Sequence, residues 1–600
     1  MNRRAHWSLL ALTALLAGAC RDRPGFDPRS PAQGPGALVG NGRPVTSGQF
    51  AGGDDVLPAP RAVTPPDGAR PPDCDAACVA YCDGAGLENP VNRGLCKGLW
   101  GVGLAPARID FEEACRRMVI DLSGAIPSAA ETRLLCAGSW GETARRLMER
   151  EGFIEVNQRR AADRYLYSTL VVNVQSIYDL DALVGKLYRG LVPYDLFAAV
   201  LSAHPVIVRR QADPRDTAEA VFVLLMGRPP FDDERADLGR LYATWQRGYY
   251  DHPALNMRVP DSFVRFPCLD EQGEVDPLRR GQCTSVLWGF NEIILQPDLR
   301  ATRDRESGEL VTWNGVLEGE EWATLQLPGR ALARERAFWE YAVDQVLLQY
   351  LGYDLGTDVP AVREELVNWL LAHDGDLRSV HYAVLTSAAY LQSARLTTPA
   401  PYRWVHGPLK QVEAETWIQS VARLSGKKLE GGCDYRISHP EEFLQSGSLS
   451  SYRLLKNSDW TFNEDGELDF RYADLARDLG GCQQNVASGR FKVISILTTA
   501  RQLSFVDEVC DPRGDASGGG AAIQRLLPGD LAPSLAMTEA LAEDVARHQY
   551  RTFLGRSPSA EETAEARAAG AQCALGLCTA ENFARPLCFA LLSSAEVLFY

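Results

Sequence analysis

The chain has 600 residues, of which 46% are hydrophobic and 23% are charged, and its formal net charge is −16. This composition is typical of a globular protein with enough length for two or three domains. The acidic balance argues against a nucleic-acid groove, so we expect no nucleic-acid partner.

The first 20 residues have the features of a lipoprotein signal peptide. Arg3 and Arg4 precede an apolar run at 7–16, and the sequence AGAC at 17–20 resembles a lipobox. We expect acylation of Cys20, and by resemblance to bacterial lipoproteins Arg21 is not an inner-membrane retention residue. The expected location is therefore the outer membrane, lipid-anchored, on its periplasmic or cell-surface face. Cleavage without lipidation is the alternative, because position 17 holds Ala rather than the more usual Leu.

Residues 21–73 are rich in Pro and Gly and have few large apolar side chains, which predicts a flexible tether that acts as a passive spacer. No later stretch has the length of an uncharged membrane-spanning helix. We divide the rest into an N-terminal helical domain at 74–210, an irregular connecting region at 211–330 and a C-terminal helical domain at 331–600.

The cysteines favour disulfides. Of the 15 cysteines, an even number remain when Cys20 is set aside, in a chain that we expect to leave the reducing cytosol. Pairing within segments is expected, with two local candidate pairs: Cys115 with Cys136, and Cys268 with Cys283.

Three patterns suggest ligand sites, and each has a simpler structural explanation. Cys74, Cys78 and Cys82 have a spacing that suits a tetrahedral metal site poorly, and no His lies nearby, so no metal is expected. Residues 463–469 partly resemble a calcium loop but lack its alternating Asp pattern, which favours a turn. Residues 518–520 lack the Lys-Ser/Thr of a phosphate loop.

The longest periodic part of the sequence predicts four packed helices. The first covers about 335–351 and ends at Gly352, and the second begins at Pro360. The third has Asp376 as its N-cap and an inward face that extends to Leu391, and the fourth ends at Gly426. Short loops between such helices favour antiparallel packing. We therefore predict a mainly α, multi-helical fold with long disulfide-braced loops and at most minor β structure.

This part of the chain resembles the C-terminal, 1553-type half of a bacterial surface-protein family built from paired domains of unknown function 1549 and 1553. The similarity rests on FWEYAVDQVLLQYLGYDLG at 338–356, EELVNWLL at 364–371, DLRSVHYAVLTSAAYLQS at 376–393 and GPLKQVEAETWIQSVARLSG at 407–426. The N-terminal helical domain at 74–210 resembles the 1549-type half through RRMVIDLSGAIPSAAET at 116–132 and LYRGLVPYDLFAAVLSAHP, which begins at Leu187. Tyr382 stands where the family usually has Arg. Family members are often fused to c-type cytochromes, but this chain has no Cys-x-x-Cys-His, so no haem or other cofactor is expected.

The pattern Gly-x-x-Pro-x-x-x-Glu occurs three times, beginning at Gly124, Gly227 and Gly555. In each copy Gly ends one helix and Pro fixes the turn, and in two copies Ser128 or Ser559 forms a capping box with the Glu three residues later. Position 231 of the middle copy is Phe, so there either Asp232 caps the helix or the box is open.

His381 is the one candidate for chemistry, because it coincides with a His of the family signature. It also falls on the apolar face of its helix, which favours a core histidine bonded to a backbone carbonyl over a catalytic base or ligand. The catalytic residues are otherwise unknown.

Two functions remain open. The first is an exported lipoprotein that acts without catalysis, as a surface binding or scaffold protein for an unidentified protein or polysaccharide. The alternative is an extracellular enzyme that acts on surface polymer or in a redox pathway, which only the cytochrome-fused relatives suggest. We favour the first, and whether the protein is an enzyme stays open.

Overall fold

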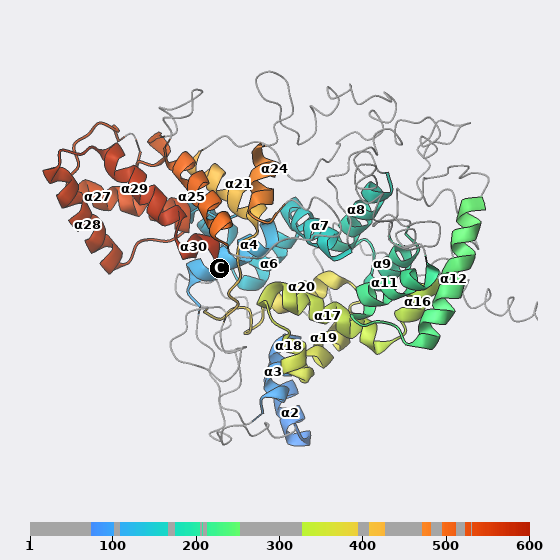
Figure 1. The fold of residues 1–600 in the computed structure, drawn as a ribbon. Coiled ribbons are helices and arrows are strands. Elements are labelled where there is room, and N and C mark those ends of the chain that lie inside the picture. Colours follow the sequence, from blue (N-terminus) through green and yellow to red (C-terminus); the bar gives the residue numbers. More distant parts are fainter. Residues whose placement is uncertain are drawn as a thin grey trace, which may run out of the picture.

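The computed structural model describes residues 74–100, 109–165, 175–204, 207, 213–251, 327–393, 407–426, 471–481, 495–511, 523–529 and 531–600. Within these residues the fold is helical (Figure 1). The β structure there is limited to two isolated antiparallel bridges, Gln411 with Phe599 and Ala536 with Thr579. The prediction of a mainly α, multi-helical fold is confirmed.

Helices fill most of the described chain. Up to residue 251 they are α2 (Ala76–Gly84), α3 (Pro90–Gly98), α4 (Phe111–Ser123), α5 (Ala129–Leu135), α6 (Trp140–Met148), α7 (Glu151–Tyr165), α8 (Gln175–Tyr188), α9 (Tyr194–Ala203), α11 (Pro214–Met226) and α12 (Asp232–Asp251). From residue 327 they are α16 (Leu327–Leu332), α17 (Arg336–Leu351), α18 (Leu355–Asp358), α19 (Pro360–Ala372), α20 (Leu377–Leu385), α21 (Ala414–Ser425), α24 (Arg471–Asp478), α25 (Ile496–Cys510), α27 (Glu539–Gln549), the π-helix η8 (Tyr550–Leu554), α28 (Ala560–Leu575), α29 (Ala580–Leu592) and α30 (Ala595–Leu598).

The predicted ends of the central helices are largely those observed. α17 ends where Gly352 takes a φ of 76°, a left-handed conformation that glycine adopts without steric cost. Pro360 lies in the first turn of α19, and the Asp376 side chain caps α20. α20 is shorter than predicted, because it ends at Leu385 and the chain then turns. Leu391 still packs against the core from that turn.

The described helices pack around two large hydrophobic cores. One includes side chains from α3 to α12 and from α16 to α20, so segments before residue 210 and after residue 331 pack together. The other is built from α21 to α30. α4 belongs to both, because Met118, Val119 and Leu122 lie in the first core and Ile120 lies in the second. α4 is therefore the helix on which the two cores meet.

The three Gly-x-x-Pro corners are observed as helix–turn–helix junctions. Both predicted capping boxes are present, Ser128 with Glu131 and Ser559 with Glu562. In the middle corner the backbone N–H of Phe231 donates to Glu234 at 2.7 Å, so half of the box persists without a Ser.

An arginine holds the glutamate of each corner, which the sequence pattern did not predict. Arg228 and Arg556 each donate two hydrogen bonds of 2.8 Å to their own corner's Glu234 and Glu562. The first corner has no Arg at that position, and Arg423 of α21 takes the role by binding Glu131 at 2.7 Å. That contact also ties α21 to the corner after α4.

Five disulfides brace the described residues: Cys74–Cys78, Cys82–Cys96, Cys115–Cys136, Cys510–Cys588 and Cys573–Cys578. The structure therefore pairs Cys115 with Cys136, as the sequence suggested. The expectation that pairing stays within segments is wrong for Cys510–Cys588, which joins α25 to α29 across 78 positions. The metal alternative for Cys74, Cys78 and Cys82 is wrong, because all three sulfurs are in disulfides. The predicted pair Cys268–Cys283 lies outside the described residues.

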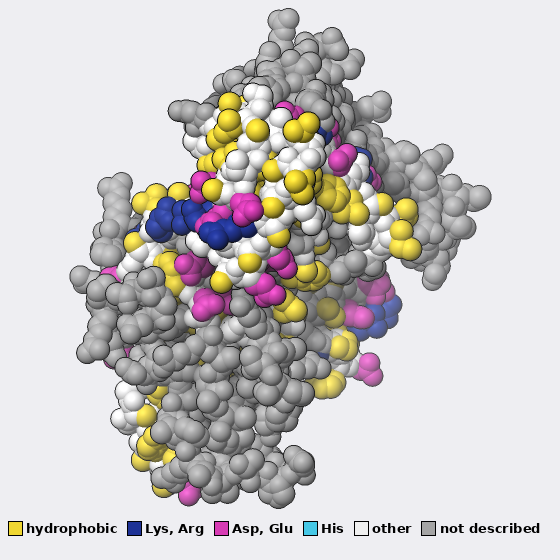
Figure 2. All heavy atoms as spheres, turned by 90° about the vertical axis from the view of Figure 1, so that its left-hand side faces the viewer, with side chains coloured by type: hydrophobic (Ala, Val, Ile, Leu, Met, Phe, Trp, Pro, Cys, Tyr) yellow, Lys and Arg dark blue, Asp and Glu magenta, His cyan; other side chains and the backbone are white. Residues whose placement is uncertain are grey.

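The helices α27, α28 and α29 form one end of the molecule, which Figure 2 shows face-on. On that face Lys and Arg side chains gather in a compact group beside acidic and hydrophobic side chains. This end carries the second core and contributes to the surface hollow described below.

Candidate functional site

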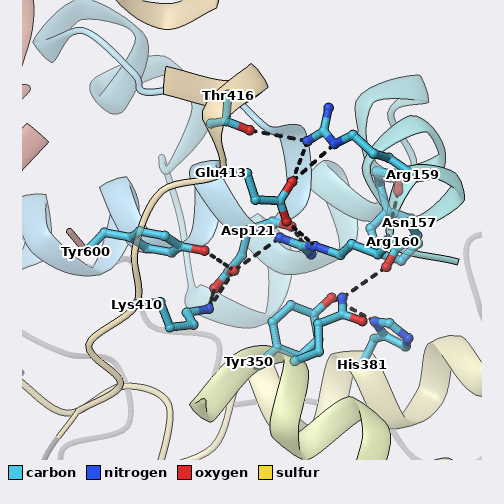
Figure 3. Close-up of polar contacts among 12 residues, drawn as sticks. Asp121, Asn157, Arg159, Arg160, Tyr350, His381, Lys410, Glu413, Thr416 and Tyr600 are labelled. Atoms are coloured by element: carbon cyan, nitrogen blue, oxygen red, sulfur yellow. Dashed lines mark hydrogen bonds and ion pairs between the residues drawn. The ribbon is translucent and has the colours of Figure 1, made fainter. Parts of the chain in front are cut away.

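A buried polar network of the described chain is centred on the carboxylate of Asp121, near the C-terminus of α4, which accepts four side-chain hydrogen bonds. Its side chain is fully buried and accepts hydrogen bonds from Lys410 Nζ at 2.6 Å to each oxygen. The hydroxyls of Tyr390 and Tyr600 donate to it at 2.8 Å, and Arg160 lies 3.7 Å away (Figure 3). We call these five residues the Asp121 junction.

Lys410 approaches the junction from the segment that leads into α21. Its backbone exchanges two hydrogen bonds of 2.9 Å with Tyr600, so the two side chains enter the junction side by side. The ammonium also lies 4.7 Å from the centre of the Tyr600 ring. Burial lowers the pKa of Lys410 to about 8, against the opposing effect of Asp121. Lys410 thus depends on that carboxylate for its charge.

A second carboxylate extends the network toward α7. Glu413 is the N-cap residue of α21, and its two oxygens bind Arg160 at 2.9 Å and Arg159 at 2.8 Å. Arg160 also donates to the backbone oxygen of Asp121 at 3.1 Å, which links the two carboxylates. The network therefore fastens α4, α7 and α21 to one another.

His381 packs against side chains of the first core, below this network in Figure 3, and its own side chain is fully buried. Its Nδ1 is 2.7 Å from the hydroxyl of Tyr350, so the predicted partner, a backbone carbonyl, is wrong. The rings of Phe153, Tyr188 and Tyr350 meet the imidazole edge to face. Burial lowers the pKa of His381 to about 3, with Arg164 and Arg160 acting in the same direction, so the ring is neutral at physiological pH.

The surroundings of Asp121 and His381 determine what each side chain can do chemically. The oxygens of Asp121 are occupied by protein donors, and its position inside the molecule gives it a structural role. It accepts from the buried hydroxyl of Tyr390 and from the part-buried hydroxyl of Tyr600 and ammonium of Lys410, polar groups that need a partner inside the protein. His381 packs as a core aromatic residue. Both therefore explain how the helices are held together.

The sequence did not single out Asp121, Lys410 or Arg160. A signal existed at Asp121, which interrupts the apolar run at 118–122 on a helix whose neighbouring positions are all buried. A charge in such a run requires a partner inside the protein. The partner itself could not be named, because Lys410 lies 289 positions further along the chain.

A different kind of site opens at the surface between the corner after α4 and the C-terminal helices. It is a groove of about 750 Å³, lined by Ser128, Ala129, Ala130, Arg133, Pro528, Leu531, Leu541, Asp544, Arg547, His548, Arg551 and Thr552. We call it the α5–α27 groove. Its volume is in the range of ligand-binding clefts. The groove combines aliphatic side chains with three arginines and one carboxylate.

The other sequence candidates lie elsewhere. Cys20 and residues 463–469 and 518–520 fall outside the described residues. Among the described residues there is no cluster of three or more His, Cys, Asp or Glu with the geometry of a metal site. No described helix is both long enough and apolar enough to cross a membrane.

The described residues thus define a disulfide-braced helical protein with a buried charge junction and an open cationic groove. Comparison of the chain with models of protein families, with curated proteins and with solved structures found no match.

Proposed function

We propose that the protein is an exported lipoprotein that holds a non-enzymatic binding or scaffold body at the outer membrane, and that the α5–α27 groove is where it binds its partner. In this proposal acylated Cys20 is the anchor and residues 21–73 are the tether. The resemblance to the paired-domain surface family belongs to the same proposal.

The observation that carries the proposal is that two arginines which line the groove have no ion-pair partner among the described residues. Arg133 and Arg551 line it, and neither forms an ion pair with any residue of the described chain. Unpaired cations beside aliphatic side chains in a concave surface are what a binding site offers to a complementary partner.

The alternative, an extracellular enzyme, has less support. His381, the candidate for chemistry, is fully buried among aromatic rings and bonded to Tyr350. A catalytic base must come within hydrogen-bond reach of a substrate proton. In the structure the side chains that contact His381 include those of Tyr350, Phe153 and Tyr188, all from the protein itself.

Site-specific photo-cross-linking in intact cells tests the binding function. A photoreactive residue in place of exposed Ala130, in the groove, should give a discrete covalent adduct, and the same residue at exposed Arg334, between α16 and α17, should not. The Ala130 adduct should disappear when Arg133 and Arg551 are both replaced by Glu. An adduct that forms equally from both positions, or none from Ala130, would contradict the proposal.

Fractionation of the same cells tests the anchor. The full-length protein should sediment with the outer membrane, and Cys20→Ala should move the chain to the soluble fraction. If Cys20→Ala remains with the membrane, the lipid-anchor part of the proposal is wrong.

A further inference from the structure

The α5–α27 groove follows one continuous face of two consecutive helices. Leu541, Asp544, His548 and Arg551 recur at three- and four-residue steps along α27 and η8, so their side chains share one face. From Leu541 to Arg551 this face is about 15 Å long at the rise of a helix. An extended peptide of about four or five residues spans the same length.

Charge pairing is uneven along the groove. The carboxylate of Asp544 is matched by Arg547, 3.1 Å away, and Arg547 also binds Glu543. Arg551 bonds only the hydroxyl of Ser557, at 3.3 Å, and Arg133 has no side-chain partner in the described chain. The groove therefore has an excess of about two positive charges, in a protein whose formal net charge is −16.

The remaining lining distinguishes between classes of partner. Besides Ser128, His548 and Thr552 it is aliphatic, with Ala129, Ala130, Pro528, Leu531 and Leu541, and none of the residues that line the groove is Phe, Tyr or Trp. Aliphatic surface matches the aliphatic side chains of a peptide. The described lining has no Phe, Tyr or Trp ring against which the face of a sugar could lie, and its one imidazole, that of His548, bonds the backbone oxygen of Arg525 at 2.8 Å. A protein segment therefore suits this surface better than a polysaccharide does.

The cationic end of the groove is built on unusual backbone geometry. η8 is a π-helix of five residues, and it carries Arg551 and Thr552 into the lining. Short π-helical segments are rare and occur frequently at functional sites. The π-helix is an observation independent of the excess positive charge, and it lies at the same part of the groove, where Arg551 is located.

We propose that the α5–α27 groove binds an acidic segment of a partner protein, about four or five residues in extended conformation, whose carboxylates meet Arg133 and Arg551. Aliphatic side chains of the segment lie on Leu531, Leu541 and the alanines of α5. This inference rests on the proposed binding function and assigns the chemical class of the partner.

Fluorescence anisotropy with the full-length protein tests the inference. The probe is a labelled peptide of alternating Glu and Leu, and its matched control has Gln in place of every Glu. The acidic peptide should bind saturably and about tenfold more tightly than its amide counterpart. Its affinity should fall as NaCl rises from about 50 to about 300 mM, because exposed ion pairs are screened.

Charge reversal locates the binding. Arg133→Glu combined with Arg551→Glu should weaken binding of the acidic peptide by about tenfold or more, whereas Arg334→Glu, a change at an exposed arginine outside the groove, should not. Thermal melts of each variant establish that it is folded. Equal affinity for both peptides, or equal loss in the Arg334 variant, would overturn the inference.

A third probe separates this inference from the function on which it rests. An oligogalacturonate that binds more tightly than the Glu-Leu peptide, with the same dependence on Arg133 and Arg551, overturns the protein-segment assignment and leaves the binding function standing. If the protein with Arg133 and Arg551 intact gives no Ala130 cross-link in cells, by contrast, the binding function itself is wrong.

Discussion

The Asp121 junction and the α5–α27 groove both gather arginine or lysine with carboxylates, but they differ in how the charges are matched. In the junction Asp121 is fully buried, and Lys410 and Arg160 both face it. In the groove Asp544 pairs with Arg547, and Arg133 and Arg551 form no ion pair with any described residue. Water solvates an exposed cation, so an unmatched one costs little there, whereas an unmatched charge inside the protein costs several kcal/mol.

That difference separates structure from recognition. Charges that satisfy one another inside the molecule are used up in holding α4, α7 and α21 together. Charges left exposed in a concave surface remain available to a partner. Substitutions in the Asp121 junction should therefore lower the stability of the fold. Substitutions of the groove arginines should weaken binding and leave stability nearly unchanged.

The largest effect is expected from Asp121→Ala. This change leaves Lys410 and the hydroxyls of Tyr390 and Tyr600 without their acceptor, inside the protein. We expect a loss of about 3–5 kcal/mol in the free energy of unfolding, which is typical when one partner of a buried ion pair is removed. Urea unfolding monitored by circular dichroism, with the disulfides intact, measures it.

A double-mutant cycle sharpens that result. Lys410→Met removes the buried ammonium, so the double variant Asp121→Ala/Lys410→Met should be more stable than Asp121→Ala alone. A cost below about 1 kcal/mol for Asp121→Ala would mean that the tyrosines and Lys410 find other partners, and the contrast with the groove would fail.

The parts of the fold that could be predicted are those with local causes. Gly352, Pro360 and Asp376 mark helix ends through backbone geometry or capping, and all three lie where the sequence indicated. The capping boxes at Ser128 and Ser559 follow from spacing of three residues. The end of α20 was missed because no glycine or proline marks it.

The sites were harder to predict because their causes are not local. Asp121 meets Lys410 and Tyr600 only after two cores have packed around α4. The groove likewise combines Arg133 with Arg551, which the sequence separates by more than 400 positions. Periodicity predicts which face of a helix is buried but does not say which other helix covers it. His381 shows the limit, since its burial was predicted and its partner was not.

His381 offers an intermediate effect within the first core. His381→Ala opens a cavity and leaves the buried hydroxyl of Tyr350 without its partner. We expect a loss of about 2–4 kcal/mol in the free energy of unfolding. His381→Gln can keep one hydrogen bond to Tyr350 and should cost less. Unchanged melting temperatures for both variants would instead make His381 a candidate for chemistry and favour the enzyme alternative.

The pH dependence of the stability difference between wild type and His381→Gln gives an independent check. The folded pKa of His381 is about 3, so between pH 6.5 and 3 the unfolded chain binds a proton there that the folded chain does not. Stability contributed by neutral His381 is therefore complete above pH 6.5 and is lost as the pH falls. By pH 5 this loss is about 2 kcal/mol, and a Gln at this position does not undergo it. The stability gap between wild type and His381→Gln should narrow by that amount from pH 7.5 to pH 5.

The smallest effect is expected at the groove. Arg133→Glu and Arg551→Glu should each leave the free energy of unfolding within about 0.5 kcal/mol of wild type, because neither arginine has an ion pair within the described residues and both side chains are exposed. Arg423→Glu is the matched control, since Arg423 binds Glu131 at 2.7 Å and the backbone oxygen of Ile126 at 2.6 Å.

That control sharpens the comparison because Arg423 contacts the same corner from which Arg133 extends. Its reversal places a carboxylate against Glu131 and removes a hydrogen bond to a part-buried carbonyl, so it should cost about 1 kcal/mol. Thermal and urea unfolding of the three variants, measured together, distinguishes the two roles. If Arg551→Glu costs as much as Arg423→Glu, the groove arginines are also part of the scaffold, because a side chain free for a partner contributes little to folding. If only Arg423→Glu is destabilising, any loss of peptide binding in the groove variants reflects lost recognition rather than a loosened fold.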